Sequence, residues 1–374
     1  MIYLDWIISS YSSIKIQKIK PVIRNILRMS LYQILFMDSV PDHAAVSEAV
    51  KLTKKRGYSG LVPFVNGILR AFLRGGVKPG MPENVKYAVP GWMYNKLTGD
   101  LGKKRTDAFL KDAGEPKKEL YARLVLSRAP KEDIIEMLRI DGCEVSEVEE
   151  IPEAVRIRNV GNLTELNAYK QGLIFIQDLS SIRVGRCAYQ QAEDPKGVRR
   201  IVDVCAAPGG KALHLAELFP QALVTARDLS RKKTELIEEN IQKSGLSNIC
   251  AQVYNALDFD PEFEKRADLV LADLPCSGLG VIGRKPDIKL RLKEEDLKDL
   301  AELQREILGV VSNYVSPNGL LIFSTCTVNK EENEDNAAWF EKNHPFKKLF
   351  EQQYLPPETE GDGFYISVFR KTDP

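Results

Sequence analysis

Apolar residues in the first eighty positions recur every three or four residues, which is the pattern of amphipathic helices. Residues 18–38 carry one such stripe, and Pro21 stands where that helix can begin. Residues 41–57 carry a second stripe that ends at Gly57, a residue type that commonly follows a helix. The segment "LVPFVNGILRAFLRGG" carries a third. We therefore predict three helices before a punctuated stretch rich in glycine and proline.

The pattern changes twice after this stretch. Between about 81 and 171, "ELYARLVLSRAP" and two short segments within "CEVSEVEEIPEAVRIRNVG" predict strands, and "KEDIIEMLRIDG" predicts a helix, which suggests a small α+β module. From about 172, strands alternate with helices, which is typical of a parallel sheet with crossover helices. The predicted strands are Ile201–Val204, Leu223–Arg227, Ile249–Tyr254, Leu269–Ala272, Leu320–Ser324 and a last one in "DGFYISVFRK".

Composition and charge narrow the class of protein. The chain has 374 residues, 44% of them apolar, so two or three domains with real cores are expected. Its six cysteines form no CxxC pair and only three histidines are present, so we expect no metal site and no disulfide framework, as in a cytoplasmic protein. No apolar run reaches the ~18 residues of a membrane span. We expect a monomer without membrane contact.

The net charge of +1 hides an asymmetry between the two ends of the chain. Residues 1–80 carry twelve Lys and Arg against four Asp and Glu, a net charge of +8. Such a basic segment favours contact with a polyanion. A basic face that is merely solvated explains the charge about equally well.

"RRIVDVCAAPGGKALHLAEL" reads as a strand, a glycine-rich turn and a helix. Glycines let the backbone approach a ligand, and the helix N-terminus supplies free N–H donors. Asp228 follows at the end of the next strand, where a carboxylate can accept hydrogen bonds from both hydroxyls of a ribose. Turn and acid together favour a cofactor that contains adenosine. The alternative is a tight turn without a ligand.

Two cysteines close predicted strands. Cys276 follows "LVLADLP" and Cys326 follows "LLIFST", so both lie at the carboxyl ends of parallel strands, where open α/β sheets place their ligand sites. If the strands are neighbours, the thiols converge, but their spacing leaves open which one is the nucleophile. We interpret Cys143, Cys187 and Cys250 as structural, because free cysteine usually behaves as a small buried hydrophobe.

Three blocks, "DVCAAPGGKALHLAE", "ADLPCSGLGVIGRKPDIK" and "FSTCTVNKEENE", resemble the S-adenosylmethionine-dependent RNA cytosine-5 methyltransferases. "ILRMSLYQILFMDSVPDHAAVSEAV" and "PFVNGILRAFLR" resemble the NusB-type helical RNA-binding domain. The combination is similar to the bacterial RsmB/Sun family, which implies methylation of a cytosine in 16S, small-subunit ribosomal RNA. Compared with that family the helical segment lacks its opening helices, so we expect an incomplete bundle that exposes part of its apolar face.

The resemblance implies a multidomain chain. Residues 1–80 would form a partial all-α NusB-like RNA-binding domain, and residues 81–171 a small α+β, RRM-like linker domain that binds RNA. Residues 172–374 would form the α/β Rossmann-like methyltransferase domain.

The resemblance also implies roles for single residues. Cys326 is the expected nucleophile, Cys276 assists release of the adduct, and Asp273 holds the cytosine. The expected cofactor-binding residues are Cys205, Ala206, Ala207, Pro208, Gly209, Gly210, Lys211, Asp228, Asn255 and Asp273. Asn255 stands where the family usually has an Asp that meets the adenine, and Asp258 is a possible substitute.

After Cys276, a basic loop contains Arg284, Lys285 and Lys289, which we expect to bind phosphates beside the target base. Glycines at 278, 280 and 283 would let this loop adapt. A loop that is only solvated is the alternative. After Cys326, Asn329 and Glu332 match a capping box that would start a helix and leave Cys326 exposed at a strand-to-helix junction.

Rival functions remain at this point. A non-catalytic RNA-binding assembly factor would keep the fold without turnover. A nicotinamide-dependent oxidoreductase would share the sheet but would leave the two thiols at strand ends unexplained, and the turn is not GxGxxG. A cytosine-5 methyltransferase with a transfer RNA or large-subunit target is argued against only by the N-terminal region.

Overall fold

The computed structural model describes residues 1–116 and 119–372. Residues 117–118 and 373–374 fall within the predicted domains 81–171 and 172–374, and they lie outside the described residues. Among the helices that the structure describes, none combines the length and the apolar character that a membrane span requires.

The unit Met1–Lys96 is built from helices. They are α1 (Ile2–Tyr11), α2 (Pro21–Phe36), α3 (Asp42–Lys55), α4 (Val62–Gly75), α5 (Glu83–Lys86) and α6 (Gly91–Leu101), which runs into the second unit, with 3₁₀ turns at Ile16–Lys18 and Ser59–Leu61. The three helices predicted from apolar stripes are confirmed as α2, α3 and α4. The stripes of α2 and α4 meet in a core that fully buries Leu27, Leu31 and Leu69.

The second unit, Leu97–Pro374, begins with α7 (Lys103–Gly114) and a small antiparallel sheet in the order β2-β3-β1-β4. The sheet and its connections comprise β1 (Leu120–Leu124), α8 (Lys131–Ile140), β2 (Glu144–Glu147), β3 (Ala154–Arg158), a 3₁₀ turn (Leu163–Glu165), α9 (Asn167–Lys170) and β4 (Ile174–Ile176). The predicted strands and helix of the small α+β module are present, but the predicted bounds 81–171 differ from the structure. Strand β4 lies beyond residue 171, and residues 81–96 belong to the first unit.

Both faces of the small sheet are covered. Ala122 and Leu124 point to one face and pack with Ile134 of α8. Tyr121 points to the other face and packs with Leu179 of α10 (Leu179–Gln191), the helix that leads into the large sheet. Alternation of side chains along β1 therefore fixes the small sheet between α8 and α10.

The large sheet has seven strands in the order β10-β11-β9-β8-β5-β6-β7. Its strands are β5 (Arg200–Asp203), β6 (Leu223–Asp228), β7 (Ile249–Val253), β8 (Ala267–Asp273), β9 (Val315–Thr325), β10 (Phe346–Tyr354) and β11 (Phe364–Lys371). Strands β5 to β9 pair in parallel, and β10 and β11 are antiparallel. All six strands predicted in this half are confirmed, and β10 is an addition.

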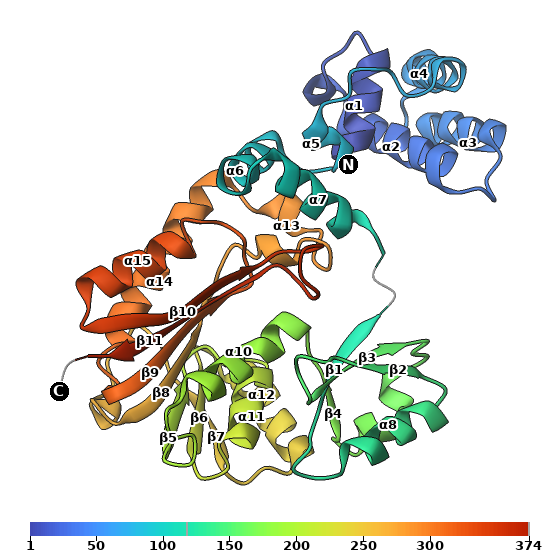
Figure 1. Ribbon diagram of the computed structural model, residues 1–374. Helices are drawn as coiled ribbons and strands as arrows, with labels where there is room; N and C mark the ends of the chain where they lie inside the picture. The colour runs from blue at the N-terminus through green and yellow to red at the C-terminus, as the bar shows by residue number, and fades with distance from the viewer. Residues whose placement is uncertain (117–118, 373–374) are drawn as a thin grey trace. The chain divides into compact units, whose positions relative to one another are not determined.

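Helices cover both faces of the large sheet (Figure 1). One face packs on α10, α11 (Gly210–Leu218) and α12 (Arg231–Ser244), and the other on α14 (Glu294–Val311) and α15 (Glu334–Asn343). The short α13 (Ile288–Arg291) and 3₁₀ turns at Pro261–Phe263 and Leu279–Val281 lie in the connections. Because both faces are buried, the loops at the carboxyl ends of the parallel strands are left to form a site.

Candidate functional site

A cavity of about 330 Å³ lies at the carboxyl ends of β5, β8 and β9. Its lining includes most of the predicted cofactor-binding turn, namely Cys205, Ala206, Ala207, Pro208, Gly210 and Lys211, together with the predicted site residues Asp273, Arg284, Lys285 and Cys326. The structure therefore brings the three motif blocks together at one place. Sequence reasoning did not single out Gln177, Asp178, Asp203, Asp362 and Phe364, which also line this cavity.

The turn after β5 shows why glycine is needed there. Gly209 has φ +105° and stands at the N-cap of α11, in the left-handed region that side chains rarely adopt. Gly210 lines the cavity with Gln177, and a Cβ there would make an ordinary 3.4 Å contact with Gln177 Oε1, so the need for glycine rests on Gly209. The N-terminus of α11 thus opens onto the cavity, where its N–H groups can meet a polar ligand.

Asp203, the last residue of β5, is a buried carboxyl group beside this cavity. Its Oδ1 accepts a hydrogen bond from the Cys205 N–H at 3.3 Å, whereas Oδ2 is buried and has no hydrogen-bond partner. Burial, and then the charge of Asp273, raise the pKa of Asp203 to about 8. An unpaired buried carboxyl at the cavity fits a ligand that brings a cationic or hydrogen-bonding group.

Asp228 and Asn255 occupy neighbouring strand ends without lining the cavity. Asp228 ends β6, and its Oδ2 accepts from the Ala207 N–H at 3.1 Å, so the carboxylate holds the turn itself. Lys233 pairs with its Oδ1 at 3.1 Å. Asn255 lies beyond β7, and its Oδ1 accepts from the Leu257 N–H at 3.2 Å in a local turn. Their predicted contacts with ribose and adenine stay predictions.

The two cysteines at the strand ends meet. Strands β8 and β9 are parallel neighbours, with Asp273 opposite Ser324, and the Sγ atoms of Cys276 and Cys326 lie 3.3 Å apart. Both thiols are free and half-buried. Of the three cysteines interpreted as structural, Cys143 and Cys187 are buried, but the interpretation of Cys250 as buried is wrong because it is exposed. It lies on β7, which is one of the two edge strands of the sheet.

The surroundings of the two thiols are unequal. The contact from Cys276 lowers the pKa of Cys326 despite its burial, and the charges of Lys211 and Lys285 act in the same direction. The pKa of Cys276 is raised well above the ordinary value by its contact with Cys326 and by burial. Cys326 is therefore the thiol that ionises first, and Cys276 is the thiol that keeps its proton.

Lys211 and Asp273 form an ion pair beside the thiols. Lys211 Nζ lies 2.7 Å from Asp273 Oδ2, and Ser324 Oγ donates to Asp273 Oδ1 at 2.7 Å. Burial alone would lower the pKa of Lys211, but Asp273 outweighs it and the pKa is raised. Lys211 also lies over the ring of Phe364, at 5.3 Å from its centroid. A fixed positive charge is thus held at the edge of the cavity near Cys326.

The glycines of the basic loop serve close packing. A Cβ on Gly280 would lie 1.9 Å from the carbonyl oxygen of Gly363, and the Gly280 N–H donates to the Cys326 carbonyl at 3.1 Å. A Cβ on Gly283 would lie 3.0 Å from the Ala113 carbonyl of α7. The interpretation of these glycines as a source of adaptability is therefore wrong for Gly280 and Gly283, because both are packed against backbone.

The three predicted RNA-binding cations have different environments. Arg284 donates to Asp362 at 2.9 Å and to Asp178 at 2.8 Å, so its guanidinium already bridges two carboxylates. Lys285 lines the cavity, and its charge favours the Cys326 thiolate. The pKa of Lys289 is lowered by burial. Lys289 is not among the described residues that line the cavity, whereas Arg284 and Lys285 are.

The residues after Cys326 do not start a helix where the sequence predicts one. Helix α15 begins at Glu334 with Asn333 as its N-cap, so the capping box at Asn329 and Glu332 is wrong. The same pair does interact, with Asn329 Nδ2 donating to Glu332 Oε1 at 3.0 Å. Glu332 is fully buried and receives further donors instead of capping a helix. Cys326 accordingly lies half-buried in a loop, not exposed at a helix start.

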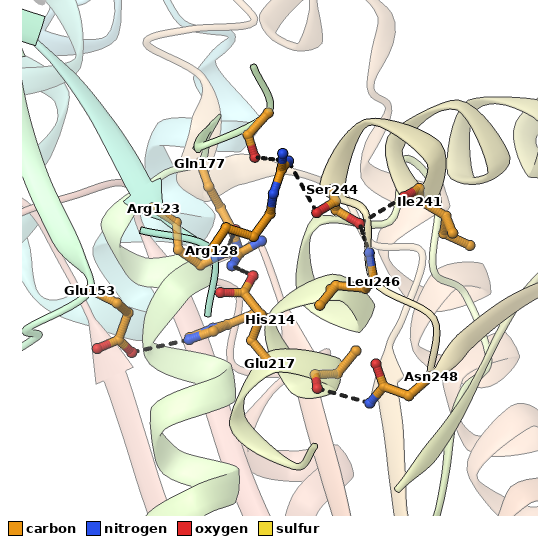
Figure 2. Close-up of polar contacts among 12 residues, drawn as sticks. Arg123, Arg128, Glu153, Gln177, His214, Glu217, Ile241, Ser244, Leu246 and Asn248 are labelled. Atoms are coloured by element: carbon orange, nitrogen blue, oxygen red, sulfur yellow. Dashed lines mark hydrogen bonds and ion pairs between the residues drawn. The ribbon is translucent and has the colours of Figure 1, made fainter. Parts of the chain in front are cut away.

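A buried polar seam joins the small sheet to α11 (Figure 2). Arg123 of β1 is fully buried, pairs with Glu217 of α11, and donates to Gln177 Oε1 at 3.1 Å. In the same view, His214 of α11 contacts Glu153 Oε1 at 3.0 Å, and burial lowers the pKa of His214 to about 4. Because Gln177 also lines the cavity, the seam reaches the candidate cofactor site.

Two family models and a relative of known family match this chain. The family "16S rRNA methyltransferase RsmB/F" matches residues 190–370, and the NusB family matches residues 1–74. The chain is 34% identical to a probable ribosomal RNA small subunit methyltransferase B of Bacillus subtilis, over 99% of this chain and 87% of the relative.

Two solved structures share the fold. The crystal structure of PH0851 has a TM-score of 0.80 and 27% identity, covering 98% of this chain and 86% of that one. The structure of NSun6 from Pyrococcus horikoshii with SFG has a TM-score of 0.69 and 21% identity, covering 77% and 100%.

Proposed function

Because this chain belongs to the ribosomal RNA small subunit methyltransferase B family, we propose that it methylates carbon 5 of a cytosine in 16S ribosomal RNA. It is a methyltransferase, and its cofactor is S-adenosylmethionine. The observation that carries the cytosine-5 proposal is the pair of free thiols, 3.3 Å apart, at the edge of the cofactor cavity.

The residues around the cavity fit this cofactor. S-adenosylmethionine carries an ammonium and a sulfonium, and the unpaired Oδ2 of Asp203 offers a partner to a cationic group. The turn from Cys205 to Lys211 and the N-terminus of α11 would hold its polar atoms, with Asp228 and Asn255 at the adjoining strand ends. When bound, the cofactor supplies the methyl group.

The chemistry of cytosine explains the need for two thiols. Carbon 5 is a poor nucleophile, so a group must first add to carbon 6 and turn carbon 5 into an enamine-like centre. Cys326 is suited to this addition because its environment favours the thiolate. After methylation, the proton on carbon 5 must leave before the Cys326–C6 bond can break. Cys276 holds a proton in the resting pair and would release it to solvent once Cys326 is bonded to carbon 6. The Cys276 thiolate is then placed to accept the proton from carbon 5.

Lys211 and Asp273 are placed to position the base. The carboxylate of Asp273 can accept from the cytosine amino group, and the Lys211 ammonium holds that carboxylate at 2.7 Å. The target cytosine must be unstacked to reach the thiols, so a loop or bulge is a better substrate than a paired base. Lys285 at the cavity and the basic segment 1–80 would contact the surrounding phosphates.

Bisulfite sequencing of ribosomal RNA tests the proposal directly. Cells lacking the gene, cells complemented with the parent gene, and cells complemented with the Cys326→Ser variant are compared. We expect one protected cytosine in small-subunit RNA to lose protection in the first and third strains only. An unchanged pattern in all RNAs would overturn the proposed reaction, and a change confined to transfer RNA or large-subunit RNA would overturn the proposed target.

A further inference from the structure

We propose that Glu332 is a positioning residue that sets the division of roles between the two thiols, by joining their loops and by disfavouring negative charge on Cys276. The inference rests on the proposed cysteine chemistry and adds the residue that makes the two cysteines different. Glu332 does not line the cavity among the described residues, so its influence has to pass through the thiol loops.

Glu332 holds the Cys276 loop through several contacts at once. Its Oε2 accepts from the Ser277 N–H at 2.9 Å, and its Oε1 accepts from the Ser277 hydroxyl at 2.5 Å. Gln304 of α14 donates to Oε2 at 3.0 Å and to the Pro275 carbonyl at 2.9 Å. The residues on either side of Cys276 are therefore fixed by Glu332 and by its partner Gln304.

The same group fixes the Cys326 loop. Ser277 Oγ lies 2.7 Å from Thr327 Oγ1, and Thr327 is the residue after Cys326. Glu332 itself belongs to this loop, where Asn329 Nδ2 donates to its Oε1. A single carboxylate thus links the residues that follow the two cysteines, and this link supports the 3.3 Å separation of the sulfur atoms.

The contacts of Glu332 favour a charged carboxylate. The Ser277 N–H and the side-chain amides of Gln304 and Asn329 can only donate, and the Ser277 hydroxyl supplies a fourth contact. A protonated carboxyl would have to direct its O–H to Ser277 Oγ, and the Ser277 hydroxyl would then donate to Thr327 Oγ1 instead of to Glu332. Burial raises the pKa of Glu332, but the donors oppose that rise by stabilising the ionised form.

This negative charge acts unequally on the two thiols. The causes that raise the pKa of Cys276 are, in order, its contact with Cys326, burial, the charge of Cys326 and the charge of Glu332. Cys326 instead faces the cations Lys211 and Lys285, with Asp273 opposing them. Glu332 is therefore on the side of the pair that must keep its proton, and the cations are on the side that must lose it.

The arrangement suits the proposed sequence of steps. While Cys276 is neutral it does not compete with Cys326 for carbon 6, and it donates to the Cys326 thiolate. Once Cys326 is bonded to carbon 6, its negative charge no longer opposes ionisation of Cys276. Cys276 then releases its proton to solvent, and the resulting thiolate beside Glu332 is a strong base for the proton on carbon 5. The proton moves from carbon 5 to the Cys276 sulfur, and the electron pair released expels the Cys326 thiolate.

The test measures the titration of Cys276 without RNA or cofactor. Cys276 alkylation by iodoacetamide is followed by mass spectrometry across pH in the Cys326→Ser protein, with and without Glu332→Gln. We expect Glu332→Gln to lower the midpoint by about one pH unit, which means about tenfold more thiolate at neutral pH. Glu332→Asp keeps the charge, so the pH midpoint of Cys276 alkylation should return most of the way to its value in the Cys326→Ser protein. Glu331→Gln, at the exposed neighbouring position, is the matched control and should leave it unchanged.

Ser277→Ala provides a second test should Glu332→Gln fail to fold. It retains the carboxylate and its contact with the Ser277 N–H but removes the hydroxyl that joins Glu332 to Thr327, so we expect the two loops to move apart and Cys276 to donate less well to Cys326. We expect alkylation of Cys326 to slow at neutral pH in this variant. An unchanged Cys276 midpoint in folded Glu332→Gln, or unchanged Cys326 reactivity in Ser277→Ala, would overturn the proposal. Because neither readout requires methyl transfer, these results are independent of whether cytosine is the target.

Discussion

The Sγ atoms of Cys276 and Cys326 lie 3.3 Å apart although fifty positions separate them in the chain. Neighbouring parallel strands deliver them to the same edge, and their unequal surroundings leave Cys326 as the thiol that ionises first. This pair is the basis of the first two predictions.

Replacing Cys326 by Ala should abolish methyl transfer, because no other described thiol has both a lowered pKa and a place on the cavity wall. We expect incorporation of labelled methyl into small-subunit RNA to fall below about one thousandth of the parent rate. Thermal stability should change little, which a melting curve checks. Retention of substantial activity would show that Cys326 is not the nucleophile.

Replacing Cys276 by Ala should instead trap the protein on its RNA. Cys326 can still add to carbon 6, but the proton on carbon 5 then lacks its base and the adduct persists. A slowly migrating protein–RNA band should appear on a denaturing gel in the presence of S-adenosylmethionine. The Cys276→Ala, Cys326→Ala double variant is the control and should give no band; a band there would place the covalent bond elsewhere.

Gly280→Ala should damage the site through backbone contact alone. The new Cβ would lie 1.9 Å from the Gly363 carbonyl, and neither segment is a flexible side chain. We expect a loss of stability of at least about 2 kcal/mol and loss of activity. Gly309→Ala in α14 meets nothing within 4 Å and should stabilise the protein by about 0.5–1 kcal/mol. Denaturant unfolding of both variants measures the contrast, and equal effects would contradict the packing argument.

Asp203→Asn should stabilise the protein increasingly as pH rises. The pKa of Asp203 is raised to about 8 in the folded chain, so between about pH 4 and 8 the folded chain keeps a proton that the unfolded chain has lost. The free energy of unfolding of the parent therefore falls across this window, with Asp273 and Asp228 adding to the effect and Lys211 opposing it.

The asparagine variant lacks this titration, so its Tm advantage over the parent should grow from pH 4 to pH 8. Asp299→Asn, at an exposed position of α14, is the control and should show no such trend. A Tm difference for Asp203→Asn that is flat across this pH range would contradict the raised pKa.

Substitutions at Arg284 and Lys285 should have different effects, the first lowering the stability of the protein and the second lowering its affinity for RNA. Arg284→Ala leaves Asp178 and Asp362 without their shared cation, and we expect a loss of about 1–3 kcal/mol and weaker cofactor binding. Lys285→Ala should weaken RNA binding at all sequences and reduce the slope of log affinity against log salt by about one. Calorimetry and filter binding across salt concentrations provide the measurements. A reduced salt slope for Arg284→Ala would show that RNA recruits its guanidinium from the two carboxylates.

Features with a local signature could be predicted from the sequence. The parallel strands are short apolar runs, and Pro208 and the two glycines that follow it indicate the turn after β5. The position of Cys276 and Cys326 at strand ends followed from the same pattern. Helix α1 was missed because its residues are apolar on most sides and form no single stripe. Helix α7 and the edge strand β10 were missed because most of their residues are polar, so few apolar positions mark their periodicity.

Features that depend on contacts distant in the chain could not be predicted. Glu332 has the spacing from Asn329 that a capping box requires. Its actual partner is Ser277, fifty-five positions away, and only the folded chain brings the two together. Arg284 stands in a run of cations that suggests phosphate binding, yet Asp178 and Asp362 reach it from two other segments. Asp203 is an ordinary strand residue until its burial beside Asp273 is known.

The parallel pairing of β8 with β9 also determines where this chain can change length. Asp273 lies opposite Ser324, and each cysteine follows within three residues. A slip of one residue between these strands would carry Cys326 about 3.3 Å along the sheet and turn every side chain of β9 to the opposite face. Insertions in the loop between α13 and α14 should leave that register intact, because neither strand and no residue of α14 that packs on the sheet lies there. The distance between the thiols should thus be insensitive to the length of that loop, but intolerant of a residue inserted where the pairing is regular, between Leu269 and Asp273 or between Leu320 and Ser324.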